Sequence, residues 1–172
     1  MTALPVLTQA EADRLLAEPK REARGEAHTF PAPAGHLVIP LVSIDGRRDF
    51  LVDVSRSQLR LERIWYQLRA RRVDILCRLC LNGKRHTNPD SFPPEGRSDL
   101  LALRGITMPA THLHIYIEGF DDSWAVHAPQ DLVPAPPDPV RTLRAFLRRC
   151  GLVDTPILSK GLDLFGGFDE GV

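Results

Sequence analysis

The stretch Val73-Asp74-Ile75-Leu76-Cys77-Arg78-Leu79-Cys80-Leu81 decides the fold, because one half of its alternating positions is apolar throughout. In a strand, successive side chains point to opposite faces of the sheet. The pattern therefore predicts a strand that is buried largely on one side and ends at the turn Asn82-Gly83. Upstream, residues 59–69 alternate only in part and are rich in helix formers, so a strand and a helix both fit that segment.

Further elements are predicted on either side of this stretch. Residues 36–44 and 49–54 flank Asp45-Gly46-Arg47-Arg48, a turn typical of hairpins. A capping box at Thr8-Gln9-Ala10-Glu11 predicts a helix that ends before Pro19. A second helix is expected over residues 139–150, with Asp138 as N-cap and Gly151 just past its end. Loops are expected over residues 20–35 and 88–109, the second with a helical turn near residues 98–103.

Together these elements predict an α+β fold, with an antiparallel sheet of about five or six strands and N- and C-terminal helices. The chain has 172 residues, which suits one domain. We expect a single α+β domain over residues 1–150, followed by an acidic and hydrophobic C-terminal tail over residues 151–172. That tail is predicted to cover a sheet edge or to bind a protein partner.

Composition indicates an ordinary globular protein, with 43% hydrophobic and 26% charged residues. Its longest apolar run, residues 37–44, is too short to span a membrane and contains a proline. The N-terminus lacks a basic segment followed by an apolar one. We therefore predict a cytoplasmic protein with no membrane partner.

The charge is distributed unevenly although its formal sum is zero. Residues 56–85 are strongly basic, with only Glu62 and Asp74 as acids, whereas acids predominate after Gly151. Clustered arginines attract phosphate, so this middle segment predicts a face that binds anions or nucleic acid. A solvated, arginine-rich sheet edge is the alternative. The basic residues are Arg56, Arg60, Arg63, Arg69, Arg71, Arg72, Arg78, Lys84 and Arg85.

Three cysteines, Cys77, Cys80 and Cys150, are too few for a disulfide scaffold. Cys77 and Cys80 form a CxxC, which is typical of zinc and redox sites. In a strand, however, residues three apart point to opposite faces and cannot share a metal ion. We therefore interpret all three as small core residues.

Polar side chains that could carry chemistry recur along Thr111-His112-Leu113-His114-Ile115-Tyr116-Ile117-Glu118-Gly119. In a strand, His112, His114, Tyr116 and Glu118 share one face. A second polar cluster, His86-Thr87-Asn88-Pro89-Asp90, precedes it. The test for a site is whether the His86 imidazole meets those of the strand.

One hypothesis is a metal site, because His112-x-His114-x-x-x-Glu118 places two imidazoles and a carboxylate on one face. This spacing is similar to the first motif of the cupin family, whose barrels bind iron, manganese or zinc. The second cupin motif is missing, and His127 lacks its setting. We therefore expect neither a cofactor nor a bound metal.

The leading hypothesis is metal-independent cleavage of RNA, with the chain as a small, toxin-like endoribonuclease. His86, His112 and His114 would serve as general acid and base, and Tyr116 would orient or donate a proton. Side chains expected to bind the substrate are Arg56, Arg63, Arg78, Arg85 and Trp124. The expected partner is nucleic acid, RNA rather than DNA. The alternatives are a metal-dependent enzyme and a non-catalytic interaction factor in phage defence or counter-defence.

Motif order adds a resemblance to a known family. Phe50-Leu51-Val52-Asp53, Tyr66-Gln67, His86-Thr87-Asn88-Pro89-Asp90, His112-x-His114-x-Tyr116-x-Glu118-Gly119 and Trp124-Ala125 follow one another in that order. This pattern resembles an uncharacterised family of small bacterial proteins with HxNPD and HxHxYxEG motifs. The resemblance implies an association with phage-related and mobile-element genes, and it supports the choice of site residues. It implies no particular reaction.

Overall fold

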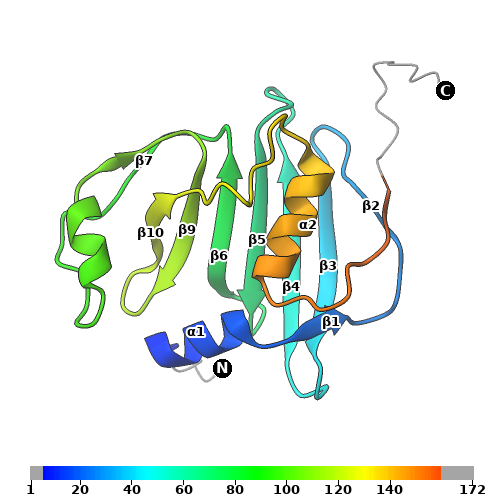
Figure 1. Ribbon diagram of the computed structural model, residues 1–172, viewed down its shortest axis with the longest axis horizontal. Helices are drawn as coiled ribbons and strands as arrows, with labels where there is room; N and C mark the ends of the chain where they lie inside the picture. Colours follow the sequence, from blue (N-terminus) through cyan, green and yellow to red (C-terminus); the bar gives the residue numbers. More distant parts are fainter. Residues whose placement is uncertain (1–5, 160–172) are drawn as a thin grey trace.

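The fold is built on a seven-stranded antiparallel sheet with the strand order β1-β3-β4-β5-β6-β9-β10. A computed structural model describes residues 6–159 (Figure 1). The strands of this sheet are β1 (Lys20–Glu22), β3 (His36–Ser43), β4 (Asp49–Arg56), β5 (Ile64–Ala70), β6 (Asp74–Leu81), β9 (His112–Ile117) and β10 (Asp121–His127).

Smaller elements lie around this sheet. Strand β2 (His28–Thr29) pairs in parallel with β11 (Leu158–Ser159), and β7 (His86–Thr87) pairs with β8 (Thr107–Met108). The helices are α1 (Gln9–Ala17), the 3₁₀ helix η1 (Ser98–Leu103) and α2 (Pro139–Arg149).

The predicted α+β class and antiparallel sheet agree with the structure, but the strand count was too low. Segment 59–69 resolves in favour of a strand, β5, which pairs with β4 on one side and β6 on the other. The expected loop over residues 20–35 contains the edge strand β1 and the short β2, both too short for a visible alternation pattern. Helix α2 is followed by β11, so it is not the last element.

Residues 160–172 of the predicted tail lie outside the described part of the chain. No helix within residues 6–159 is long and apolar enough to cross a membrane.

The two faces of the sheet differ, and this difference positions the site. One face packs against α2, which lies across the middle strands in Figure 1. On this face the Tyr66 hydroxyl donates to the Pro139 carbonyl, and the Tyr66 ring lies 6.0 Å from that of Phe146. The Cys77 and Cys150 sulfurs are 3.8 Å apart in the same core. Cys77 is therefore a core residue, as predicted.

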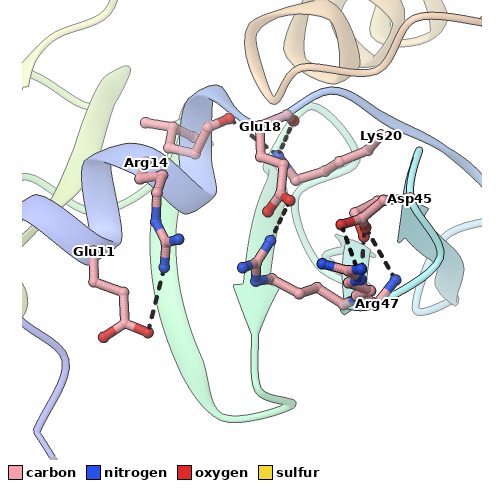
Figure 2. Close-up of polar contacts among 9 residues, drawn as sticks. Glu11, Arg14, Glu18, Lys20, Asp45 and Arg47 are labelled. Atoms are coloured by element: carbon pink, nitrogen blue, oxygen red, sulfur yellow. Dashed lines mark hydrogen bonds and ion pairs between the residues drawn. The ribbon is translucent and has the colours of Figure 1, made fainter.

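A buried lysine joins the end of α1 to the end of α2. Lys20 is fully buried, and its Nζ donates to the carbonyls of Leu16, Glu18 and Cys150 at 2.8 to 3.1 Å. Figure 2 shows this side chain pointing back toward Glu18. Because the last carbonyls of a helix have no partner within the helix, a buried ammonium satisfies them where water cannot reach.

Candidate functional site

Strand register places Arg78, His112 and His114 on the sheet face opposite α2. Directly paired residues of neighbouring strands point to the same side, so each run of paired residues forms a row across the sheet. One row is Val38, Asp53, Gln67, Arg78, His114 and Ala125; the next is His36, Ser55, Trp65, Cys80, His112 and His127. Cys80 and His112 are thus cross-strand neighbours, as are Arg78 and His114.

The two strand histidines face each other through their Nε2 atoms, which are 3.0 Å apart. Their Nδ1 atoms bind backbone carbonyls: His112 Nδ1 lies 2.6 Å from the Pro109 oxygen and His114 Nδ1 lies 2.8 Å from the Asp122 oxygen. A carbonyl oxygen only accepts hydrogen bonds, so both Nδ1 atoms carry the proton. These bonds hold both rings in one orientation.

Cys80 completes a compact group with these two histidines. No two of the three possible ligand atoms, one from each of Cys80, His112 and His114, are more than 4.8 Å apart. All three side chains are buried, with exposed fractions of 4%, 2% and 4%. Cys77, on the opposite face, is excluded from the group as the strand alternation predicted. Buried groups of this kind suit a bound ion better than direct contact with a polymer.

The His86 ring lies next to the rings of His112 and His114, as the sequence analysis required for a site. Its ring centroid lies 4.6 Å from that of His114 and 5.8 Å from that of His112. His86 Nε2 donates to the Ser123 carbonyl at 2.8 Å. The β7–β8 hairpin thus brings His86 over the irregular start of β10, where the register shifts between Asp121 and Trp124. Three imidazoles gather at one point of the sheet.

Burial governs the protonation of this group. Burial, followed by the nearby Arg78 guanidinium, lowers the pKa of His114 to about 3. Burial also lowers the pKa of His112 and raises that of the Cys80 thiol, the latter against the influence of Arg78. At pH 7 His114 is therefore neutral and has no acidic proton at Nε2 to donate to a leaving group.

Arg78 lies beside the group, and its charge is compensated. Its Nη2 is 2.9 Å from the Asp122 carboxylate, and both side chains are only partly exposed. The same residue, Asp122, accepts the His114 hydrogen bond through its backbone. Arg78, predicted to bind substrate, is thus part of the polar surroundings of the histidines.

Tyr116 and Glu118 follow the histidines on β9 but bind the N-terminal segment. The Tyr116 hydroxyl donates to the Leu7 carbonyl at 2.5 Å, and the ring is buried in the main core. A Glu118 carboxylate oxygen accepts from the Gln9 backbone N–H at 2.8 Å. Both side chains therefore hold the start of α1 against the end of β9, and Glu118 does not join the two histidines.

The other predicted substrate-binding residues lie in different surroundings. Trp124 is fully buried in a small second core with Leu100 and Ile117, so its indole cannot reach a substrate. The accessible tryptophan is Trp65, half-buried in the row of Cys80 and His112. Sequence reasoning missed Trp65 and Cys80 as site residues. Alternation along β5 and β6 shows which residues share a face with Trp65 and with Cys80. Only the pairing of β6 with β9 shows that His112 and His114 lie on that same face.

Arg63 and Arg85 lie on loops at one end of the sheet, whereas Arg56 is the last residue of β4 and pairs with Ile64, so its side chain points to the α2 face. Arg56 Nε donates to the Leu61 carbonyl and Arg63 Nε to the Asn82 carbonyl. The loop after β6 is joined to the start of β9, since the Gly83 N–H donates to the Ala110 carbonyl at 2.8 Å. These arginines are therefore brought to the same end of the sheet as His112.

A family model described as a family of unknown function (DUF6978) matches residues 7–152. The chain belongs to this family. The match covers the whole seven-stranded sheet and includes Cys80, His86, His112 and His114, so the predicted membership of an uncharacterised family is confirmed. Among curated proteins and among solved structures, nothing matches the chain.

Proposed function

We propose that this protein binds single-stranded nucleic acid, RNA in particular, through the basic loops at one end of the sheet. The observation that carries the proposal is that two hydrogen-bonded loops with four cationic side chains lie beside one accessible tryptophan. We call this surface the basic rim; it comprises Arg60, Arg63, Lys84 and Arg85, with Glu62 as the one acid of the two loops.

Hydrogen bonds hold the two loops of the basic rim together. Asn82 Nδ2 donates to the Glu62 carbonyl at 3.2 Å, and Arg63 Nε donates to the Asn82 carbonyl at 3.4 Å. Arg60, Lys84 and Arg85 are exposed. Clustered cations of this kind bind a phosphate backbone, with release of counterions and a strong dependence on salt.

Trp65 is the reason to favour a single strand. Its indole lies next to the loop after β6, since a Cβ at Gly83 would be 4.0 Å from the indole Nε1. Unpaired bases stack on accessible aromatic side chains, which contributes about 1–3 kcal/mol per base. A base on Trp65 would leave its phosphates near Lys84 and Arg85. A duplex offers no unpaired base to this position.

A rival basic surface exists on α2. Arg141, Arg144 and Arg148 line one exposed groove with Asp131. Within residues 6–159 no aromatic side chain lines that groove, and α2 lies on the sheet face away from the histidines. We therefore assign nucleic-acid binding to the basic rim and use α2 as the matched control.

The test measures binding of a labelled single-stranded RNA by fluorescence anisotropy over a range of salt concentrations. We expect Arg60→Glu/Arg85→Glu to weaken binding by about 10- to 100-fold near 0.1 M salt, and to reduce the salt slope by about 1.4, because two phosphate contacts are lost. Trp65→Leu should weaken binding by about 5- to 100-fold. The control Arg141→Glu/Arg144→Glu should bind as the wild type does.

The result that overturns the proposal is equal loss in the α2 control and in the rim variant, or no salt-dependent binding by the wild type. Quenching of tryptophan fluorescence gives a second reading. The chain has two tryptophans, and only Trp65 is accessible. Bound RNA should quench the signal of the wild type but not that of Trp65→Leu.

Cleavage of the bound RNA, a toxin-like role and a link to mobile elements stay predictions from the sequence. Of the histidines predicted for acid and base catalysis, His112 and His114 are buried, whereas His86 is half-buried. A metal-independent mechanism would therefore depend on His86 at the surface. Appearance of RNA fragments with the wild type, and their absence with His86→Ala, is the expected result if the protein cleaves.

The variant Tyr116→Phe tests whether the Tyr116 hydroxyl has a structural role or the predicted catalytic role. Because the hydroxyl donates to the buried Leu7 carbonyl, its removal should lower the free energy of unfolding by about 1 kcal/mol. RNA binding and any cleavage should be unchanged. Urea denaturation and the anisotropy assay check both statements; loss of cleavage with normal stability would instead restore Tyr116 to the site.

A further inference from the structure

The facing histidines need a positive centre between them. Both Nδ1 atoms donate to backbone carbonyls, so in the neutral rings both Nε2 atoms are acceptors. Two lone pairs at 3.0 Å repel each other in a buried setting. Either a shared proton or a metal ion between the two atoms removes this repulsion.

The position of Cys80 favours the metal ion. A shared proton needs two nitrogen atoms and no third group, whereas here a sulfur lies within 4.8 Å of both. Thiolate and imidazole are the ligands that zinc prefers in proteins, and three protein ligands leave one position of a tetrahedral ion open. The ligand atoms come from two adjacent strands, β6 and β9, in direct register.

The separations of the three ligand atoms are close to those of a tetrahedral zinc site, apart from a small movement of the Cys80 sulfur. With Zn–N of about 2.0–2.1 Å and Zn–S of about 2.3 Å, tetrahedral angles place two nitrogens about 3.3 Å apart and a nitrogen and the sulfur about 3.6 Å apart. The observed Nε2 to Nε2 distance is 3.0 Å, and the sulfur is at most 4.8 Å away. Rotation about the Cys80 Cα–Cβ bond moves the sulfur without moving the backbone.

The surroundings of the two rings are those of metal ligands. Histidines that bind a metal through Nε2 usually donate their Nδ1–H to a carbonyl or carboxylate, which fixes the ring and raises its basicity. Both His112 and His114 do so here. A thiolate would offset one charge of the ion, and Arg78 is already paired with Asp122. The ring centroid of His86 lies 4.6 Å from that of His114.

We propose that Cys80, His112 and His114 bind one zinc ion, held between β6 and β9 on the sheet face opposite α2. This site is independent of the basic rim, because none of its ligands belongs to the loops that form the rim. It differs from the motif interpretation in which Glu118 joins the two histidines. Cys80 takes the third place because it is in register with His112.

The test uses the full-length protein purified without a nickel column. Elemental analysis should find one zinc per chain. After chelation, added Co²⁺ should give visible d–d bands and a near-ultraviolet sulfur-to-cobalt charge-transfer band, which requires a thiolate ligand. Cys80→Ser should abolish the charge-transfer band, and His112→Gln and His114→Gln should weaken zinc binding by about 100-fold or more.

Matched controls separate a lost ligand from a disturbed fold. Cys77→Ala removes the other sulfur of the CxxC, and His36→Ala removes an exposed histidine of the same row; both should keep zinc and the cobalt spectrum. The charge-transfer band of the cobalt-loaded wild type reports a thiolate ligand without any substitution. The test therefore remains valid even if the Cys80→Ser variant fails to fold. Absence of zinc and of any cobalt spectrum in the wild type would overturn the proposal in favour of a shared proton. A thiolate band that survives in Cys80→Ser would overturn it as well.

Discussion

Asn88→Ala is expected to lower the free energy of unfolding by about 3–4 kcal/mol. The Asn88 side chain is buried and pairs with the backbone of Ala125 as a neighbouring strand would. Its Nδ2 donates to the Ala125 carbonyl at 2.9 Å and its Oδ1 accepts from the Ala125 N–H at 2.8 Å. Nδ2 also donates to the Leu103 carbonyl. Truncation leaves the two buried Ala125 groups without this partner, at about 1–3 kcal/mol each.

This prediction extends to the site, because Asn88 fastens the His86 hairpin to β10. Urea unfolding measures the loss of stability, and hydrogen exchange of the Ala125 amide reports the local loosening. Thr87→Ala is the control: Thr87 is exposed and shares one hydroxyl contact with Thr107, so a change below about 1 kcal/mol is expected. If Asn88→Ala were as mild as this control, the edge of β10 would be held by something other than Asn88.

Lys20→Met is expected to lower the free energy of unfolding by about 3 kcal/mol at pH 7. The substitution keeps an unbranched apolar stem but removes the group that donates to three carbonyls, those of Leu16, Glu18 and Cys150. Those carbonyls end α1 and α2 in a place where the Lys20 side chain excludes water. Chemical denaturation of both proteins measures the difference. Lys84→Met, an exposed lysine, should change stability by less than about 0.5 kcal/mol.

The Lys20 effect should also depend on pH. Burial lowers the pKa of Lys20 from 10.5 to about 8. Between these two values the unfolded chain keeps the proton while the folded protein has released it, so folding is favoured as pH rises through this window. The stability difference between wild type and Lys20→Met should therefore grow by up to about 3 kcal/mol from pH 8 to pH 10.5. A difference that stays constant over this range would contradict a lowered pKa.

Local patterns of the sequence predicted most of the longer strands and both α-helices. Strand β6 and the hairpin of β3 and β4 follow from alternation with a turn between, and α2 follows from its caps: the Asp138 carboxylate accepts from the N–H groups of Val140 and Arg141. These signals are complete within ten residues or so. The strands that were missed have two or three residues each, too few for a period to show: β1, β2, β7, β8 (within the expected loop 88–109) and β11.

The candidate site was predicted only in part. Alternation placed His112 and His114 on one face, and the register confirms it. The same alternation cannot show that the chain beyond His114 is held by α1, so Tyr116 and Glu118 were grouped with the histidines. Trp124 was taken for an accessible aromatic because burial by Leu100 depends on η1, a distant segment.

The sequence by itself determined the α+β class, the antiparallel strands, both main helices and the two faces of β6 and β9, because each depends on interactions within a few residues. Only the tertiary structure decided that β6 pairs with β9 across the intervening hairpin and η1, that His86 meets the two strand histidines, and that Cys80 lies beside them. Pairing between distant strands is selected by the burial of the whole sheet, and no local pattern encodes it. The sequence therefore contains the residues of the candidate metal site, but it does not predict that they lie next to one another.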